Sequence, residues 1–475
     1  MRSILPLLTL TLCIGCSTTP AGSANAQRVD LIIEHGTVIP MVGPNISDGA
    51  VAVRDGVIVA VGPTAQISST YTAADRIDAR GTAVLPGFVN THTHAPMTLF
   101  RGLADDRDLM DWLQNFIFPA EKNNVDREFV KWGTRLAAAE MIASGTTTFA
   151  DMYYFEADIA RETRAAGLRA VLGESLIDFP APDNKTWDEA IAYSRAFVGE
   201  FKGDSLITAA LAPHAPYTVS ADHLKQVRST ATELGAPILI HLAETQDELR
   251  QVAERSGGMT PVAYLDSLGF LGPDVVAAHS VWLTGAEVQT LVSRRAGVAH
   301  CPESNMMLSS GVAQVPELLR AGVNVGLGTD GPAGSNNNLD MIEEMASAAR
   351  LQKVIRKDPK ALSARQVLEM ATIGGARVLR LDQKIGTLEP GKRADIIVIN
   401  LAEPKSQPVY SVESAIVYSA NGADVLHTIV DGKVLMRDRR LLTLDTAEIT
   451  RQADLYRQKV LRSLGPAPSS PNPVE

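Results

Sequence analysis

Residues 83–94 read AVLPGFVNTHTH, an apolar run that ends in two histidines spaced two residues apart. Apolar runs of strand length occur at 83–89, 146–152, 169–175, 206–213, 236–242, 275–280, 297–302 and 323–330. Between them lie segments of helical texture, and those at 136–145, 221–235 and 315–322 end in glycine, a common helix stop. Near-continuous apolar strands that alternate with helices are typical of a parallel sheet covered on both faces. Eight such units predict an α/β fold, a closed (β/α)8 TIM barrel.

Two flanking segments have a different texture. Residues 29–62 and 394–436 alternate apolar and polar residues and turn at glycines, as β-hairpins do. We therefore expect both ends of the mature chain to meet in a small β-sandwich beside the barrel. The predicted division is a β-sandwich from 29–84 and 383–445, a barrel over 85–382, and a C-terminal helix with a disordered tail over 446–475.

The first residues have the composition of a secretory signal. An apolar run at 4–14, too short to span a bilayer stably, is followed by small and polar residues. The stretch LCIGC resembles a bacterial lipoprotein box, which would make Cys16 the acylated residue, 1–16 the signal peptide and 17–28 a linker. We therefore expect an exported lipoprotein, anchored to a membrane by its lipid and facing the periplasm or the exterior. Cleavage after 24–26, giving a soluble periplasmic protein, is the alternative.

The overall composition excludes some partners. The net charge of −10 argues against a nucleic-acid partner, which would favour a basic face. Two of the three cysteines lie in the predicted signal, so Cys301 is alone in the mature chain and no internal disulfide can form. With 45% hydrophobic residues the chain is of ordinary globular composition, and we expect a small-molecule substrate.

Most of the eight runs carry a polar or ionisable residue at or near the C-terminal end. These residues are His92, His94, Asp151, Glu174, His214, His241, His279, His300 and Asp330. Six of the nine histidines of the chain are among them. Active sites of TIM barrels lie at the C-terminal ends of the strands. The pattern therefore predicts a cavity lined by these side chains.

The two histidines of the first run indicate a metal. Residues i and i+2 of a strand point the same way, so His92 and His94 present two imidazoles to one point. Imidazole suits zinc, and a catalytic zinc takes three or four protein ligands with one position open for water. His241 and Asp330 are the natural further ligands. A pair of satisfied core histidines is the alternative, which the other strand ends disfavour.

Glu244 follows in the stretch HLAET and can reach the same cavity without binding the metal. A carboxyl group in a closed pocket has its pKa raised by desolvation, so it can carry a proton near neutral pH. The alternative is a glutamate that caps a helix N-terminus.

Together these stretches resemble the amidohydrolase superfamily, and within it the methylthioadenosine/S-adenosylhomocysteine deaminase group. The matching stretches are LPGFVNTHTHAPMTLFRG, GTTTFADMY, APHAPYTVS, HLAET, AHS, HCPESN, LGTDGPAGSNNNLDM and GTLEPGKRADIIVI. The resemblance covers residues 29 to about 440 and implies that the barrel is a metal-dependent hydrolase. The implied reaction is hydrolytic deamination, in which a metal-bound hydroxide attacks the C–NH2 ring carbon of an aminopurine nucleoside and ammonia leaves.

The resemblance implies a role for each matching residue. The metal ligands would be His92, His94, His241 and Asp330. Glu244 would pass protons to the ring nitrogen beside the attacked carbon, His279 would hold the attacking hydroxide, and Asp330 would take a proton from it. Glu121, in FPAEKNN, would bind the ribose hydroxyls, and His214 would contact the substrate beside Glu244 and Asp330.

Departures from the family pattern bear on the metal and the substrate. The fourth run ends LAPHAPY, without the lysine that bridges two metals in some relatives, so we expect one divalent metal, zinc, with Fe²⁺ as the alternative. Members that use S-adenosylhomocysteine often have an arginine after the third strand, where this chain has Glu174 and Ser175. That difference favours a neutral substituent such as methylthio or hydroxyl. Met306 and Met307 stand where a lysine is common, and we expect them to pack in the pocket wall.

Three functions remain open. The first is deamination of methylthioadenosine, adenosine or S-adenosylhomocysteine. The second is another mononuclear amidohydrolase, such as a guanine-type, pterin or triazine deaminase or dechlorinase. The third is a surface lipoprotein that only binds a metal or ligand. Glu121 distinguishes the first function from the second, because only a nucleoside has ribose hydroxyls for it to bind. The alternative is that Glu121 is a solvated helix glutamate. The resemblance also implies a homo-oligomer.

Overall fold

The computed structural model describes residues 26–464 of the 475-residue chain. The predicted signal segment 1–16, its lipidation site Cys16 and residues 465–475 of the predicted tail lie outside the described residues. Within 26–464, no helix is both long enough and apolar enough to cross a membrane.

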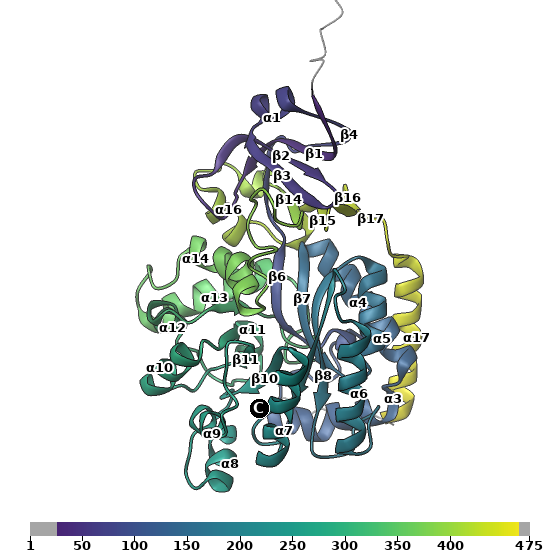
Figure 1. Ribbon diagram of the computed structural model, residues 1–475, viewed down its shortest axis with the longest axis vertical. Coiled ribbons are helices and arrows are strands. Elements are labelled where there is room, and N and C mark those ends of the chain that lie inside the picture. Colours follow the sequence, from purple (N-terminus) through teal and green to yellow (C-terminus); the bar gives the residue numbers. More distant parts are fainter. Residues whose placement is uncertain (1–25, 465–475) are drawn as a thin grey trace, which may run out of the picture.

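Eight parallel strands close into a barrel (Figure 1). They are β6 (Phe88–Thr93), β7 (Thr146–Tyr153), β8 (Arg169–Leu176), β9 (Ile207–Pro213), β10 (Ile238–Leu242), β11 (Val275–His279), β12 (Gly297–His300) and β13 (Val325–Leu327). The ring closes where Leu327 of β13 pairs with Asn90 of β6. The interior is filled by small and branched apolar side chains from successive strands, among them Val89, Ala150, Val171, Ala210, Leu239, Val276 and Ala299. The predicted TIM barrel is confirmed.

Helices cover the outside of the barrel. The longer ones are α4 (Arg127–Ser144), α5 (Glu156–Ala166), α6 (Trp187–Glu200), α7 (Ala221–Leu234), α8 (Gln246–Ser256), α10 (Gly285–Arg294), α13 (Met341–Arg356) and α17 (Thr446–Leu464). Gly145, Gly235 and Gly322 each come directly after a helix, and the backbone of each glycine is in the left-handed conformation, as the glycine pattern predicts. The C-terminal helix α17 runs beside α4, where Tyr456 meets the ring of Phe129 (Figure 1).

A separate sheet of nine strands lies at one end of the barrel (Figure 1). Its strands are β1 (Gln27–Val38), β2 (Ile46–Arg54), β3 (Val57–Pro63), β4 (Tyr71–Asp78), β5 (Thr82–Pro86), β14 (Ile396–Asn400), β15 (Val425–Val430), β16 (Lys433–Arg437) and β17 (Arg440–Leu441). The two ends of the chain meet where β5 pairs with β14 in antiparallel register. All nine strands are hydrogen-bonded into one continuous sheet, which has its own buried aliphatic cluster.

The first apolar run, 83–89, is two strands rather than the single barrel strand that the sequence predicts. Residues 83–86 belong to β5 of the separate sheet, and the barrel strand begins at Phe88. Gly87 lies at the break, where its N–H donates to the carbonyl of Asp395 and where a Cβ would lie 2.1 Å from the Thr147 side chain. The prediction was wrong because an unbroken apolar run hides a chain that leaves one sheet and enters another.

A buried ion pair joins the barrel to the separate sheet. Arg169, at the start of β8, donates from Nε and Nη2 to both carboxylate oxygens of Asp395, at 2.8 and 3.1 Å. Both side chains are at most 3% exposed. We expect Arg169→Met to lower the free energy of unfolding by about 3–5 kcal/mol, because the substitution leaves a buried carboxylate without its cation. Urea unfolding of the variant and the parent measures this loss.

A pair on the surface provides the control for that prediction. Arg195 and Glu233 form a bidentate pair with side chains 40% and 61% exposed. We expect Arg195→Met to cost under about 1 kcal/mol, because solvent screens such a pair. Equal losses in the two variants would show that burial of the Arg169 pair adds nothing.

Candidate active site

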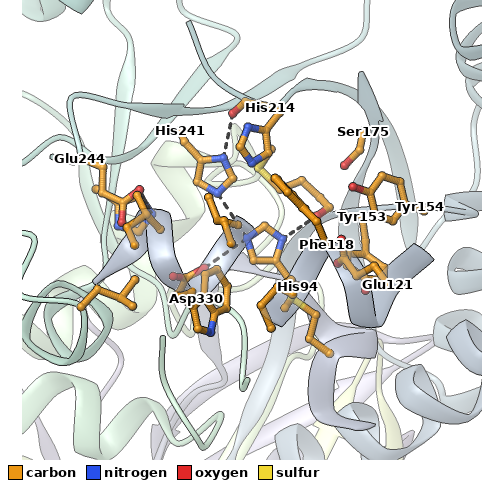
Figure 2. Close-up of a pocket in the computed structure, with 18 of the residues that line it drawn as sticks. His94, Phe118, Glu121, Tyr153, Tyr154, Ser175, His214, His241, Glu244 and Asp330 are labelled. Atoms are coloured by element: carbon orange, nitrogen blue, oxygen red, sulfur yellow. Dashed lines mark hydrogen bonds and ion pairs between the residues drawn. The ribbon is translucent and has the colours of Figure 1, made fainter. Parts of the chain in front are cut away.

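A cavity opens at the C-terminal ends of the barrel strands, as expected for this fold (Figure 2). Its volume is about 600 Å³, including the space at its mouth. Of the residues that the sequence predicts for the site, those that line it are His94, Glu121, His214, His241, Glu244, His279 and Asp330. His92 does not line the cavity but is buried within the group described next.

Four side chains form a group that can hold a metal ion. One ligand atom from each of His92, His94, His241 and Asp330 lies within 4.8 Å of all the others. The Nε2 atoms of His92 and His94 each lie 3.2 Å from Oδ1 of Asp330. Since β6, β10 and the segment after β13 supply these ligands, the closed barrel brings together residues that are more than 200 positions apart in the chain.

The hydrogen bonds of the rings show that this group requires a cation. His94 and His241 donate from Nδ1 to the carbonyls of Met152 and His214, at 2.6 and 2.8 Å. A carbonyl only accepts, so in the neutral rings both Nε2 atoms carry lone pairs, and these two atoms lie 3.3 Å apart. Nε2 of His92 is buried and makes no hydrogen bond of acceptable geometry. Burial lowers the pKa of His94, but the hydrogen bond and charge of Asp330 raise it to about 9, so a proton competes with the metal there.

Glu244 and His279 face this group from one side. Nε2 of His279 lies 3.9 Å from Oε2 of Glu244, and its Nδ1 donates to Oδ1 of Asn305 at 3.0 Å. Burial raises the pKa of Glu244, although the nearby His279 opposes that shift. Ser310 donates to Oε1 of Glu244 at 3.3 Å. The arrangement places a carboxyl group that can hold a proton beside a ring nitrogen that can accept one.

The backbone at these strand ends is held in uncommon conformations. Ala243, His279, Ser280 and Asp330 all have positive φ, between 49° and 67°. Such conformations cost free energy in residues other than glycine and persist where the surroundings enforce them, as they often do at functional sites.

Glu121 lines the opposite side of the cavity with two tyrosines. Figure 2 shows Glu121, Tyr153 and Tyr154 together, across His94 and His241 from Glu244. Burial raises the pKa of Glu121 to about 7, although the tyrosine hydroxyls and His94 lower it. The helix glutamate is therefore buried, not solvated.

Apart from Glu121, the sequence did not point to the segment that covers the cavity. Leu109, Trp112, Leu113, Ile117 and Phe118 line it from α2 (Leu109–Asp111), η2 (Trp112–Ile117) and α3 (Phe118–Asn124). Nε1 of Trp112 donates to the carbonyl of Ala333 at 2.7 Å, which ties this cover to the segment that follows β13. The stretch MYYF at 152–155 lies where β7 ends, so its position could have indicated that Tyr153 and Tyr154 line the cavity.

Some polar strand-end residues point away from the cavity. Asp151 accepts from Thr93 Oγ1 and the N–H of Ala95, both at 2.6 Å, and so supports the end of β6. Glu174 accepts from the N–H of Glu156. Neither ring nitrogen of the buried His300 has a hydrogen-bond partner among the described residues.

Two further observations concern Cys301 and the methionines. Cys301 is buried. Met306 and Met307 are 42% and 40% exposed and lie outside this cavity, so their predicted place in the pocket wall is wrong. The next residue, Leu308, lines the cavity instead, because α11 (Pro302–Met307) ends just before it.

Comparison with known proteins gives consistent matches along the chain. The model of the Amidohydrolase family matches residues 83–435, and that of the Imidazolonepropionase-like composite domain of bacteria matches 49–74. A 5-methylthioadenosine/S-adenosylhomocysteine deaminase of Syntrophobacter fumaroxidans is 47% identical, over 89% of this chain and 97% of its own. A 5'-deoxyadenosine deaminase of Methanosarcina mazei is 45% identical, over 89% and 96%. An adenosine deaminase structure from Xanthomonas campestris with bound zinc has a TM-score of 0.90 at 40% identity, over 92% and 99%.

Proposed function

Because the chain belongs to the amidohydrolase family, and is thus a hydrolase that acts on carbon–nitrogen bonds, we propose that it deaminates an adenosine-like nucleoside. One observation carries this proposal. Glu244 and Glu121, both buried, lie on opposite sides of the His/His/His/Asp group within one cavity (Figure 2). A purine amino group next to Glu244 would place the ribose of the same molecule toward Glu121.

We also propose a single zinc ion, held by His92, His94, His241 and Asp330, with Fe²⁺ as the alternative. The three imidazoles and one carboxylate suit zinc, and a related structure at 40% identity contains it. When bound, a divalent metal supplies Lewis acidity that makes water nucleophilic near neutral pH. No lysine stands at the end of β9 to bridge a second ion.

The side chains around this group divide the proton transfers of the reaction. Nε2 of His279 is free to accept a hydrogen bond from the attacking water, because Nδ1 is held by Asn305. Asp330 takes the proton that the water loses. Glu244 donates a proton to the ring nitrogen beside the carbon that carries the amino group, which makes this carbon electrophilic. Asp330 then passes its proton to the amino group, the C–N bond breaks to release ammonia, and Glu244 regains a proton from the hydroxyl group that becomes the carbonyl.

The other end of the cavity favours a nucleoside with a neutral 5' group. Glu121 can accept hydrogen bonds from both ribose hydroxyls, and Phe118 and Tyr154 give that end an aromatic wall. Among the described residues that line the cavity there is no lysine or arginine to bind a carboxylate. We therefore propose methylthioadenosine, 5'-deoxyadenosine or adenosine as substrates in preference to S-adenosylhomocysteine.

Ammonia release from the zinc-loaded enzyme tests the proposed function. The panel is methylthioadenosine, 5'-deoxyadenosine, adenosine, S-adenosylhomocysteine, guanine, cytosine and an aminotriazine. We expect turnover of the first three, with a kcat/KM at least about tenfold above that for S-adenosylhomocysteine, since its carboxylate would stay unpaired. Turnover of a free base or a triazine alone would replace the proposal by another amidohydrolase activity. Metal binding without turnover of any compound would leave only a binding function.

The Glu121 carboxylate should govern the binding of ribose. We expect Glu121→Gln to raise the KM for nucleosides by about 10–100-fold, because a hydrogen bond to a charged acceptor contributes about 1.5–3 kcal/mol. Since the pKa of Glu121 is raised to about 7, the carboxylate form prevails above that pH. The KM of the parent enzyme should therefore rise as the pH falls below about 7. A KM for Glu121→Gln that equals the parent value would remove Glu121 from the ribose site.

We propose that the enzyme is an exported lipoprotein acylated at Cys16. The support comes from the sequence alone: an apolar run at 4–14, the stretch LCIGC and the small and polar residues that follow. Metabolic labelling with a tritiated fatty acid should mark the parent protein and not Cys16→Ser. Labelling of both would point to an acylation elsewhere, and labelling of neither to cleavage after residue 26.

Sedimentation of the purified enzyme tests the homo-oligomer that the family resemblance implies.

A further inference from the structure

Three helices of the chain begin with the same pattern, a threonine followed three residues later by a glutamate. In α6 the pair is Thr186 and Glu189, and in α10 it is Thr284 and Glu287. Both pairs form a capping box, in which the glutamate side chain reaches back to the N–H of the threonine. The pattern alone predicts the same arrangement for α8, which follows Thr245.

The glutamate of α8 makes different contacts. Glu248 accepts from the N–H of Ala243 with Oε1 and from the N–H of Glu244 with Oε2, both at 2.8 Å. Thr245 still caps the helix by accepting from the N–H of Glu248. The carboxylate therefore makes no hydrogen bond to the N–H of Thr245, and its two oxygens accept from the two residues before Thr245. The Glu248 side chain is buried, at 2% exposed.

Those two residues form a strained turn that carries the Glu244 side chain. Ala243 has a φ of 52°, in the left-handed region that alanine rarely adopts. Its carbonyl accepts from the N–H groups of Val281 and Trp282, at 3.0 and 2.9 Å. The turn is thus held on its N–H side by Glu248 and on its carbonyl side by the segment after β11. Strain of this kind persists only where the surroundings enforce it.

The side chain of Glu244 has little else to fix it. Its polar contacts among the described residues are the 3.3 Å hydrogen bond from Ser310 and the 3.9 Å approach of His279. Its direction therefore depends on the backbone from which it projects. A shift of a reacting group by about 1 Å can reduce a rate about 10²-fold.

We propose that Glu248 is a positioning residue, whose carboxylate holds the 243–244 backbone so that Glu244 points at the substrate. The proposal rests on the proposed function, because it takes Glu244 as the group that transfers protons. Glu248 does not line the cavity.

The test compares Glu248→Gln with Glu287→Gln in the zinc-loaded enzyme. Glutamine keeps one carbonyl oxygen but turns an NH2 group toward one of the two backbone N–H groups. We expect Glu248→Gln to lower kcat by about 10–100-fold, with KM and zinc content within about twofold of the parent. Glu287 has the same helix position and is also buried, at 5% exposed, so Glu287→Gln should lower the melting temperature and leave kcat unchanged.

Several outcomes would overturn the proposal. The first is that the kcat of Glu248→Gln lies within about twofold of the kcat of Glu287→Gln. The second is that kcat and the melting temperature fall together in both variants, which would indicate a general loss of stability. If Glu248→Gln does not fold, Glu248→Asp provides the second variant. Its side chain is one methylene shorter and cannot reach both N–H groups, so the same fall in kcat is expected.

A measurement without substrate separates this proposal from the proposed function. Amide hydrogen exchange at Ala243 and Glu244 should be faster in Glu248→Gln than in the parent, and unchanged in Glu287→Gln. Unchanged exchange in both variants would overturn the positioning role whatever the enzyme acts on. If exchange is faster in Glu248→Gln but the parent protein turns over no nucleoside, the proposed function is wrong, while the role of Glu248 in holding the 243–244 backbone is supported.

Discussion

Glu244→Gln is expected to lower kcat for nucleoside deamination by about 10²–10⁴-fold, with KM changed by no more than about threefold. Glutamine fills the same space and can keep the hydrogen bond from Ser310, but it can neither give nor take the proton that the ring nitrogen requires. Burial raises the pKa of Glu244, so the acid form that donates this proton persists toward neutral pH. Steady-state kinetics with measurement of bound zinc checks both parts of the expectation.

Another glutamate with a raised pKa provides the control. Burial raises the pKa of Glu303 to about 7, but its side chain accepts a hydrogen bond from Ser347 and does not line the cavity. Glu303→Gln should therefore keep kcat within about twofold of the parent value. If Glu244→Gln retained a tenth or more of the activity, the proton would have to pass through His279 or Asp330 instead.

The barrel and its metal-binding group were predictable from the sequence for a single physical reason. Parallel strands of a closed barrel end on one face, so polar residues at successive strand ends must meet there. His92, His241 and Asp330 come from strands far apart in the chain, yet their ligand atoms lie within 4.8 Å. Strand position placed these residues on one face, and the spacing of His92 and His94 together with the family resemblance distinguished the ligands from other strand-end residues such as His300.

Other features depend on tertiary contacts that leave no mark on a short pattern. The apolar run at 83–89 gave no sign that Gly87 separates two sheets, because both strands are buried and apolar. The cover over the cavity is held by a bond from Trp112 to a residue more than 200 positions away. The patterns of Glu248 and Glu287 are alike, and only the strained turn at Ala243 determines which backbone groups each carboxylate binds.

Removal of the metal is expected to abolish activity and to destabilise the protein at the same time. A chelator should lower the rate by more than about 10³-fold, and one zinc ion per chain should restore it. A ligand present at about 1,000 times its Kd stabilises the folded state by about 4 kcal/mol, so the melting temperature should fall on chelation. The physical reason is that only the folded chain brings the four ligand atoms within 4.8 Å of one another, so binding of the metal favours the folded state. Ammonia release measures the activity, calorimetry measures the melting temperature without substrate, and elemental analysis measures the zinc content.

Two histidines at strand ends make this prediction specific. His241, on β10, belongs to the metal-binding group. His300 ends β12, two strands further round the barrel, and is also buried, with no hydrogen bond to either ring nitrogen among the described residues. His241→Ala should lose the zinc, because it removes one of the four ligands that hold the ion. His300→Ala should keep one zinc per chain, whatever it costs in stability. Loss of zinc in both variants would mean that the barrel mouth as a whole, rather than these four side chains, holds the metal.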